Sequence, residues 1–317
     1  MISEIPGFRV GHWTDAEIGT GCTVILPPPG NVAAVDVRGG GASSRETELL
    51  RPLAGVRSAT ALLFTGGSAF GLDAATGVVR WCERRGLGHD TVVAPVPIVP
   101  AAVIFDLGLT GGAGRPDADA GEAACEAAAE GPHARGSVGA GTGATVGKLR
   151  ARDGWCKGGL GASAARVHDG ARVAALAVAN CWGDVLSEDG TVLAGAWSPG
   201  EGFIGAARAA YRRPPEHPRL VGPESTTLVC VATDAALDAG EAGQVARMAQ
   251  SGLARAIAPV NTPMDGDAVF CLAAGRRPAS AFAVGVAAAQ VAAEAVRDAV
   301  RAATPLRGVP TAAERRG

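Results

Sequence analysis

Two adjacent threonines stand where a polar loop meets an apolar segment, in the stretch GPESTTLVCVATD at residues 221–233. Threonine is common at the start of a strand, so Thr226 and Thr227 could simply begin a buried strand. The alternative is chemical, because a threonine hydroxyl becomes a nucleophile when a base takes its proton. If the chain were cut after Ser225, the freed α-amino group of Thr226 could be that base, with an ordinary pKa of about 7.7–8.0.

Histidine is the usual base for such a hydroxyl, and this sequence has no histidine in triad-like company. The motif GxSxG is absent, and the histidines are scattered at His12, His89, His133, His168 and His217. A Ser-His-Asp hydrolase is therefore disfavoured. A chain that cuts itself needs a flexible connection before the nucleophile and a rigid element after it. The linker-like residues 198–224, rich in Pro, Gly and charge, and the apolar residues 227–233 meet that need.

Four more polar residues could serve the same chemistry. Lys148 is the first charge after a run of small residues, and it is either a solvated lysine or one beside a cavity with a lowered pKa. Asn180 interrupts an apolar segment, either as a turn residue or as an oxyanion donor. Asp265 and Asp267 flank a glycine before another apolar run. They form either an ordinary turn or a pair of carboxylates that holds an ammonium group.

The elements that must position these residues follow from the apolar pattern. Residues 22–27 and 32–37 read as strands joined by a short turn, and we expect a hairpin or neighbouring strands there. Locally paired strands and helices in blocks favour an α+β layered sandwich, with sheets covered on both faces. The other expected strands are 59–67, 171–186 with a break at Asn180, 227–233 and 268–274. The expected helices are 68–86 with Ser68 as N-cap, 117–131, 240–257 and 278–302.

Composition limits the class of protein. The 317 residues are 47% apolar and 19% charged, which suits a single domain over residues 1–317. A net charge of −2 gives no basic field for nucleic acid, and we find neither a basic amphipathic helix nor a membrane-spanning run. We find no signal peptide, and the odd number of cysteines without CxxC indicates buried thiols in a reducing compartment, so we expect a cytoplasmic protein. These cysteines are Cys22, Cys82, Cys125, Cys156, Cys181, Cys230 and Cys271.

No cofactor is expected from the motifs. The glycine-rich stretch GAGTGATVGKL fails the phosphate-binding pattern twice, because Thr142 replaces its first glycine and Leu149 follows the lysine. As a dinucleotide fingerprint it lacks a clear strand before it and a helix after it. No histidine forms a ligand pair with a cysteine, and Asp265 and Asp267 have no third acidic or histidine ligand nearby, so we expect no metal.

Several landmarks together make the sequence resemble the self-cleaving L-aminopeptidase/D-esterase family, which includes β-aminopeptidases and nylon-oligomer hydrolases. They are DVRGGG with RETELL, FTGGSAFGLDAATGV, GAGTGATVGKL, VANCWGDV, STTLVCVATDAAL and NTPMDGD. The resemblance implies a four-layer αββα sandwich like that of N-terminal nucleophile hydrolases, with different connectivity. It also implies self-cleavage between Ser225 and Thr226 into an α chain, 1–225, and a β chain, 226–317, with Thr226 as nucleophile.

The same resemblance implies the rest of the site and the activity. Lys148, Asn180, Asp265 and Asp267 match site positions in the nylon-hydrolase branch. Members are hydrolases that release N-terminal residues from small peptides, amides or esters, and they form homo-oligomers, often tetramers. Ser225 is a departure, since that branch typically has Asn there and other members have Gly. Two other functions remain open: an acyltransferase of the ornithine-acetyltransferase type, and an inactive binding or assembly protein that kept the fold.

Overall fold

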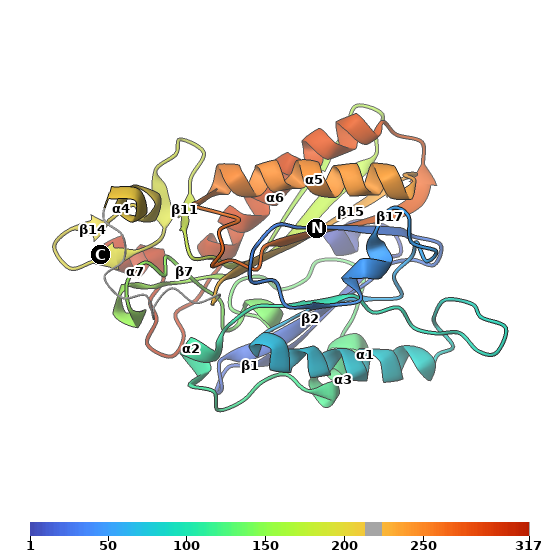
Figure 1. Ribbon diagram of the computed structural model, residues 1–317, viewed down its shortest axis with the longest axis horizontal. Helices are drawn as coiled ribbons and strands as arrows, with labels where there is room; N and C mark the ends of the chain where they lie inside the picture. Colours follow the sequence, from blue (N-terminus) through green and yellow to red (C-terminus); the bar gives the residue numbers. More distant parts are fainter. Residues whose placement is uncertain (213–223, 317) are drawn as a thin grey trace.

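Two five-stranded sheets lie face to face between outer layers of helices (Figure 1). A computed structural model of the chain describes residues 1–212 and 224–316. The first sheet contains, in spatial order, β1 (Arg9–Asp15), β2 (Thr20–Leu26), β5 (Leu62–Thr65), β6 (Ala101–Val103) and β4 (Ser44–Arg45). The second contains β3 (Val32–Val37), β17 (Ala268–Arg277), β15 (Thr226–Ala235), β10 (Arg172–Asn180) and β9 (Gly159–Arg166).

The outer layers are two pairs of helices. The helices α5 (Ala239–Ala256) and α6 (Ala281–Arg301) pack on the second sheet, and α1 (Ala74–Glu83) and α3 (Ala118–Glu126) pack on the first. The start of α5 is fixed by a capping box, in which Asp238 accepts from the Glu241 N–H and the Glu241 side chain accepts from the Asp238 N–H. The predicted α+β sandwich with four αββα layers is therefore confirmed.

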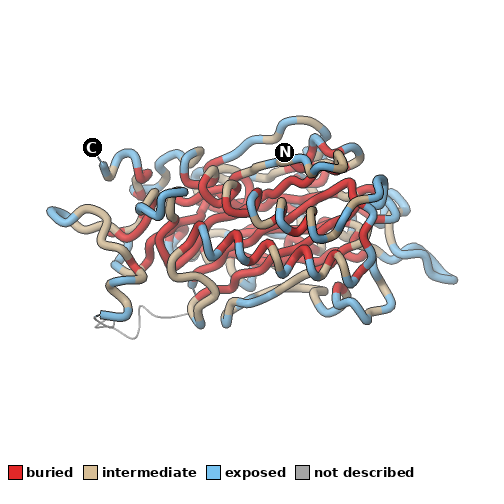
Figure 2. Tube along the Cα trace, turned by 90° about the horizontal axis from the view of Figure 1, so that it is seen from above, coloured by how far each residue is buried: buried red, intermediate tan, exposed pale blue. Residues whose placement is uncertain are grey.

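Strand alternation explains why the central strands are apolar on both faces. In β10, Ala175 and Ala177 pack toward the helices, whereas Leu176 and Val178 pack between the sheets. The neighbouring β15 alternates in the same way, and its inter-sheet series begins at Thr226 and continues through Leu228. In Figure 2 these strands form the buried interior of the molecule. The Thr226 side chain is thus directed between the sheets at the end of a strand held on both faces.

Smaller elements connect these layers. A three-stranded sheet contains β12 (Val192–Ala194), β11 (Asp184–Leu186) and β16 (Ile257–Ala258). Two-stranded pairs are β13 (Trp197–Ser198) with β14 (Gly202–Phe203) and β7 (Thr145–Val146) with β8 (Cys156–Lys157). The short α-helices are α2 (Leu107–Thr110), α4 (Ala206–Arg212) and α7 (Ala312–Arg316). The 3-10 helices are η1 (Ile2–Glu4), η2 (Thr47–Leu50), η3 (Ser68–Asp73), η4 (Gly139–Gly141) and η5 (Arg152–Gly154).

Three sequence predictions about elements are wrong. The runs at 22–27 and 32–37 form no hairpin, because β2 and β3 lie in different sheets and the turn between them crosses from one layer to the other. Ser68 is no N-cap, since it begins the 3-10 helix η3 and α1 starts six residues later. The predicted linker 198–224 contains β14 and α4 in its first part, and residues 213–223 lie outside the described residues.

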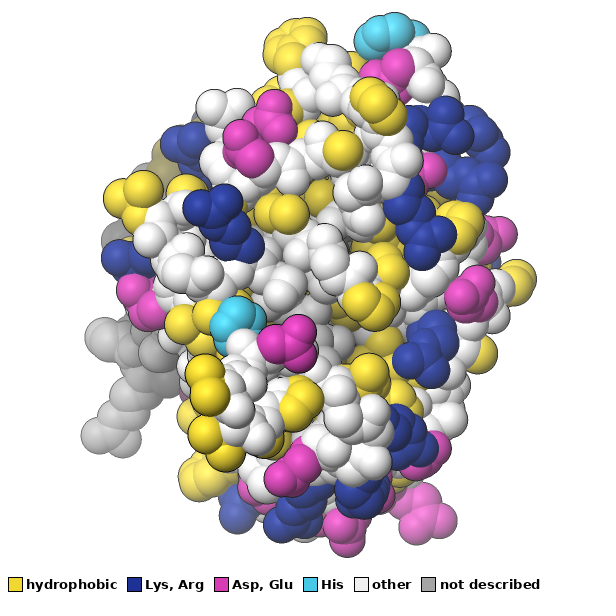
Figure 3. Space-filling model, turned by 90° about the vertical axis from the view of Figure 1, so that its right-hand side faces the viewer, with side chains coloured by type: hydrophobic (Ala, Val, Ile, Leu, Met, Phe, Trp, Pro, Cys, Tyr) yellow, Lys and Arg dark blue, Asp and Glu magenta, His cyan; other side chains and the backbone are white. Residues whose placement is uncertain are grey.

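The surface charges and the cysteines are placed as the composition predicts. Basic and acidic side chains both lie on the face shown in Figure 3, and neither covers it. All seven cysteines are buried and free of disulfides. They pack as small apolar side chains, as the sequence predicted.

Candidate active site

Four of the five predicted site residues meet at one end of the second sheet. Thr226 begins β15 and Asn180 ends β10, and the two are direct partners across this antiparallel pair. Asp265 and Asp267 come immediately before β17, which runs parallel to β15. A bridge between Ser225 and Asp265 extends that parallel pairing upstream of the strand. Residues far apart in sequence therefore lie close together, because three neighbouring strands start or stop at the same end of the sheet.

Lys148, the fifth predicted residue, reaches this edge from the loop after β7. Its Nζ donates to Asn180 Oδ1 at 2.9 Å, to the Asn180 carbonyl at 3.1 Å and to the Glu224 carbonyl at 2.8 Å. Three donated hydrogen bonds use every N–H of a protonated ammonium. The side chain is only 7% exposed, and this burial lowers the pKa of Lys148 to about 8. The loop-end lysine is therefore buried beside the candidate nucleophile and is not a solvated surface residue.

The hydroxyl of Thr226 lies against the carbonyl of the preceding residue. Thr226 Oγ1 donates to Ser225 O at 2.6 Å, and the Gly266 N–H donates to the same oxygen at 2.8 Å. Both Ser225 and Thr226 are buried. A side chain at position 266 would not fit, because a Cβ there would lie 2.8 Å from Thr226 Oγ1. The carbonyl is thus polarised by a fixed backbone donor while the hydroxyl sits beside it, the geometry of an oxyanion site.

Asn180 is held in one orientation by three contacts. Its Oδ1 accepts from Lys148 Nζ and from the Thr145 N–H at 3.0 Å, and its Nδ2 donates to the Phe105 carbonyl at 3.1 Å. The amide oxygen therefore faces Lys148. Of the two hydrogens on Nδ2, one is engaged by the Phe105 carbonyl.

The two aspartates fix the backbone around the site. Asp267 Oδ1 accepts from the Thr227 N–H at 2.5 Å, and its Oδ2 accepts from the Asn261 N–H at 2.9 Å. Asp265 Oδ2 accepts from the Thr262 N–H at 3.1 Å and hydroxyl at 2.5 Å. Burial, together with the nearby charge of Asp265, raises the pKa of Asp267 to about 7. In the uncut chain these carboxylates thus hold backbone and hydroxyl groups beside Thr226.

Sequence reasoning missed the backbone groups of the site. The Gly266 N–H lies between the two predicted aspartates, and the Glu224 carbonyl lies just before the predicted cut. The run DVRGGG packs its Gly39 so close to this loop that a Cβ would lie 2.2 Å from the Asp267 nitrogen. Gly266 and the glycines of DVRGGG were the available signal in the sequence, because a close approach of two backbones requires residues without a side chain.

A small cavity opens beside the site. It measures about 10 Å³, close to the least space that a single water molecule needs, and Lys148, Thr145 and Glu224 are among its lining residues. Glu224 is thus part of the wall of this cavity, next to Lys148.

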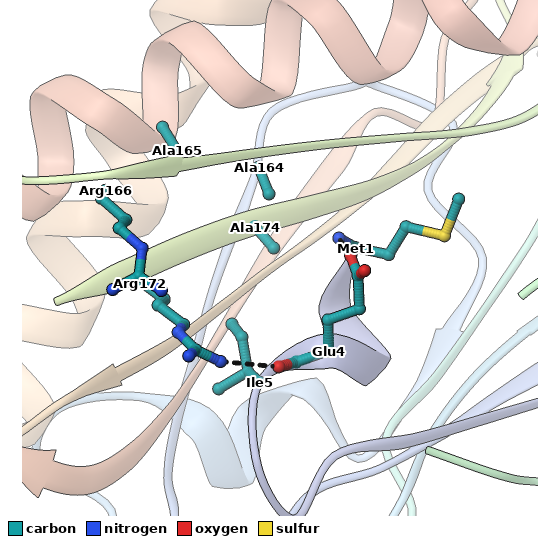
Figure 4. A pocket seen from close by; sticks show the side chains of 8 residues that line it. All are labelled: Met1, Glu4, Ile5, Ala164, Ala165, Arg166, Arg172 and Ala174. Atoms are coloured by element: carbon teal, nitrogen blue, oxygen red, sulfur yellow. Dashed lines mark hydrogen bonds and ion pairs between the residues drawn. The ribbon is translucent and has the colours of Figure 1, made fainter. Parts of the chain in front are cut away.

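A larger cavity of about 420 Å³ lies elsewhere, between the N-terminal residues and the strands β9 and β10 (Figure 4). Its polar lining includes Arg166 and Arg172, and Arg172 Nη1 donates to the Glu4 carbonyl at 2.9 Å. Because Arg172 begins β10 and Asn180 ends it, this cavity lies at the far end of the strand from the candidate nucleophile.

Within residues 1–212 and 224–316, no group of three or more His, Cys, Asp or Glu side chains could hold a metal ion. Among the described helices, none combines the length and the apolar character that crossing a membrane requires.

Comparison with solved structures defines the class of fold. The L-aminopeptidase D-Ala-esterase/amidase of Ochrobactrum anthropi, described as a variant of the Ntn hydrolase fold, superposes with a TM-score of 0.73. The alignment covers 99% of this chain and 91% of that chain at 21% identity. A Burkholderia sp. β-aminopeptidase gives 0.70 at 23% identity, with the same coverage of both chains. The chain therefore has the αββα fold of Ntn-type hydrolases.

Sequence comparison then gives the family. The model of peptidase family S58 matches residues 1–313, and this chain belongs to that family. An uncharacterized aminopeptidase of Mycobacterium tuberculosis is 42% identical over 98% of this chain and 96% of its own length. The 6-aminohexanoate-oligomer endohydrolase of Paenarthrobacter ureafaciens is 30% identical over 93% and 84%. The predicted resemblance is confirmed, and the chain is a hydrolase of peptide or amide bonds.

Proposed function

We propose that the chain cuts itself between Ser225 and Thr226 and then hydrolyses small peptides, amides or esters with Thr226 as nucleophile. The observation that carries this proposal is the pair of donors on one carbonyl: Thr226 Oγ1 at 2.6 Å and the Gly266 N–H at 2.8 Å from Ser225 O. The hydroxyl contacts the carbonyl group that it would attack, and the backbone donor stands where negative charge would develop.

Self-cleavage follows as an N→O acyl shift. The Thr226 oxygen forms a bond to the Ser225 carbonyl carbon, the peptide C–N bond breaks, and the hydroxyl proton passes to the departing nitrogen. Water then hydrolyses the resulting ester, which leaves a carboxylate on Ser225 and restores the Thr226 hydroxyl. The products are the chains 1–225 and 226–317.

The surrounding residues take distinct roles in this scheme. Lys148 holds the segment before the cut through the Glu224 carbonyl and assists proton transfer or stabilises negative charge. Asn180 supplies a second oxyanion donor and orients Lys148. Asp267 positions the backbone of Thr227, and with Asp265 it offers negative charge to the ammonium group that cleavage creates at Thr226.

Turnover would repeat the first half of the same chemistry on a foreign carbonyl. The α-amino group of Thr226 takes the hydroxyl proton and passes it to the leaving amine or alcohol as the acyl group moves to Thr226 Oγ1. Water then hydrolyses this ester and restores the hydroxyl. We expect the release of N-terminal residues, in line with the names of the aminopeptidase relatives. The scheme uses no cofactor.

We also propose a cytoplasmic homo-oligomer, in which a tetramer is the expected size. The seven buried, unpaired thiols support a reducing compartment.

Exposed apolar side chains at Phe282 and Val286, one turn apart on α6, offer surface that a second copy could cover. Light scattering on the purified protein measures the size of the assembly.

Replacement of the nucleophile tests the proposed function. Thr226→Ala should give a single uncut chain without hydrolase activity, whereas Thr226→Ser, which keeps a hydroxyl, should still cut itself. Denaturing gels and intact-mass measurements read the outcome. A Thr226→Ala protein that still splits in two would refute the assignment, and cleavage with only acetyl transfer to glutamate would favour an acyltransferase.

A further inference from the structure

The uncut chain lays its own residues 224 and 225 across the site in the way that a bound substrate would lie. The Ser225 carbonyl, which Thr226 would attack, accepts from the Gly266 N–H at 2.8 Å. One residue upstream, the Glu224 carbonyl accepts from Lys148 Nζ at 2.8 Å. Two consecutive carbonyls are therefore held by two separate donors of the site.

Self-cleavage and turnover share one type of intermediate, an acyl group esterified to Thr226 Oγ1. The residue that supplies this acyl group takes the place of Ser225 in both reactions. Whatever is attached to its nitrogen takes the place of Glu224, next to Lys148. In an internal amide that group carries a carbonyl, and in an N-terminal residue the nitrogen is a free ammonium.

We infer that Lys148 recognises a carbonyl one residue upstream of the bond to be cut, so that the preferred acyl donors have an acylated amine. Internal amide bonds of peptides or other oligoamides belong to this class. This inference rests on the proposed function and goes beyond it, because it ranks the substrates: N-terminal residues are released, and an acylated amine makes the bond a better substrate.

The charges around Lys148 support this preference. Lys148 is only 7% exposed. Its ammonium donates a charge-assisted hydrogen bond to an upstream carbonyl, as it does to that of Glu224. A substrate ammonium at the same place would instead meet a like charge with little screening.

The acidic groups nearest to Lys148 are engaged elsewhere. Asp106, which lines the same small cavity, accepts from Thr20 Oγ1 at 2.6 Å and from the Gly67 N–H at 2.7 Å. Asp265 accepts from Thr262 and, at 3.3 Å, from the Trp182 N–H. Both carboxylates thus already accept hydrogen bonds from groups of the fold.

Three matched substrates test the inference on the processed enzyme. They are the p-nitroanilides of N-acetyl-L-serine, of N-ethyl-L-serine and of L-serine. The acetyl and ethyl compounds are similar in size, but only the first has the upstream carbonyl, and the ethyl compound keeps a protonatable amine as L-serine p-nitroanilide does. We expect kcat/KM for the acetyl compound to exceed both others by about tenfold to a hundredfold, the usual worth of a hydrogen bond to a charged group.

The outcomes separate this inference from the proposed function. If L-serine p-nitroanilide is cut as fast as the acetyl compound or faster, while Thr226→Ala is inactive, the inference is wrong and the proposed function stands. Equal rates for the acetyl and ethyl compounds also refute it, because size alone would then explain binding. Release of nitroaniline by Thr226→Ala at the wild-type rate would instead overturn the proposed function.

Discussion

Two buried lysines, Lys148 and Lys157, lie in neighbouring regions and differ in what they hold. Lys157, in β8, is fully buried and donates to the carbonyls of Gly141, Ala144 and Gly158 at 2.9–3.0 Å. Lys148 also donates three hydrogen bonds, but its acceptors are Asn180 and the Glu224 carbonyl beside the proposed cut.

The comparison teaches that burial alone does not mark a catalytic lysine. Burial lowers the pKa of both, to about 8 for Lys148 and to about 7 for Lys157. The acceptors make the difference. Those of Lys157 are backbone carbonyls within the folded loops, so it stabilises structure, whereas Lys148 contacts the Glu224 carbonyl, one residue before the proposed cut.

Among the residues around Thr226, the largest effect on self-cleavage should come from removing the Lys148 ammonium. Lys148→Met keeps the apolar stem but loses all three donors, and we expect self-cleavage to slow by about 10²–10⁴-fold. A time course of intact mass after purification measures this rate. An unchanged cleavage rate in Lys148→Met would show that Lys148, like Lys157, has only a structural role.

A smaller effect is expected at Gly266. In Gly266→Ala the new Cβ would lie 2.8 Å from Thr226 Oγ1 and displace the hydroxyl, and we expect cleavage about tenfold to a hundredfold slower. Gly243→Ala in α5 is the matched control, since its Cβ would meet only Pro52 at an ordinary 3.6 Å. Equal rates for the two variants would argue against this account of the carbonyl site.

The pH dependence of self-cleavage tests whether the protonated form of Lys148 is the one that supports cleavage. Since the pKa of Lys148 is lowered to about 8, the ammonium that holds Glu224 is present below that pH and lost above it. Cleavage should therefore fall above pH 8, by about tenfold per unit at the steepest. Lys148→Arg keeps its charge throughout and should lack this decline. A wild-type rate that rises from pH 8 to 10 as in the arginine variant would contradict the role.

The smallest effect on cleavage is expected at Lys157. Lys157→Met should change the cleavage rate of the folded protein by less than about threefold, but lower the free energy of unfolding by about 1–3 kcal/mol, because buried carbonyls lose a donor. Urea unfolding near pH 6 measures this, where Lys157 keeps its proton.

The pH dependence of unfolding offers a second test of Lys157. Between pH 7 and 10.5 the unfolded chain binds a proton that folded Lys157 has released, so wild-type stability should rise with pH relative to Lys157→Met. Cleavage lost in a fully folded Lys157→Met protein would break the comparison between the two lysines.

Side chains of the site could be predicted from the sequence more fully than its backbone groups. Thr226, Asn180 and Lys148 each stand at the border between an apolar run and a loop, and strand ends of one sheet meet at one edge. The Gly266 N–H and the Glu224 carbonyl carry no such signal, since every residue has these groups and only the fold selects which of them face the site.

The fold was predictable in its layers and less so in its connections. Strands that are apolar on both faces, as in β10, predict a sheet that is covered on both sides. The short turn before β3 reads like a hairpin, yet it links two sheets, because pairing depends on partners distant in sequence such as β17. Lys157 escaped notice because a lysine among glycines usually lies at the surface.

In the proposed function, the backbone opens before Thr226 without help from another protein. The intact mass of the purified wild-type chain after incubation, with the N-terminal sequence of each product, tests this directly. We expect two species, residues 1–225 and a chain that begins Thr-Thr-Leu-Val. A single species of 317 residues, or a cut at any other bond, would contradict it.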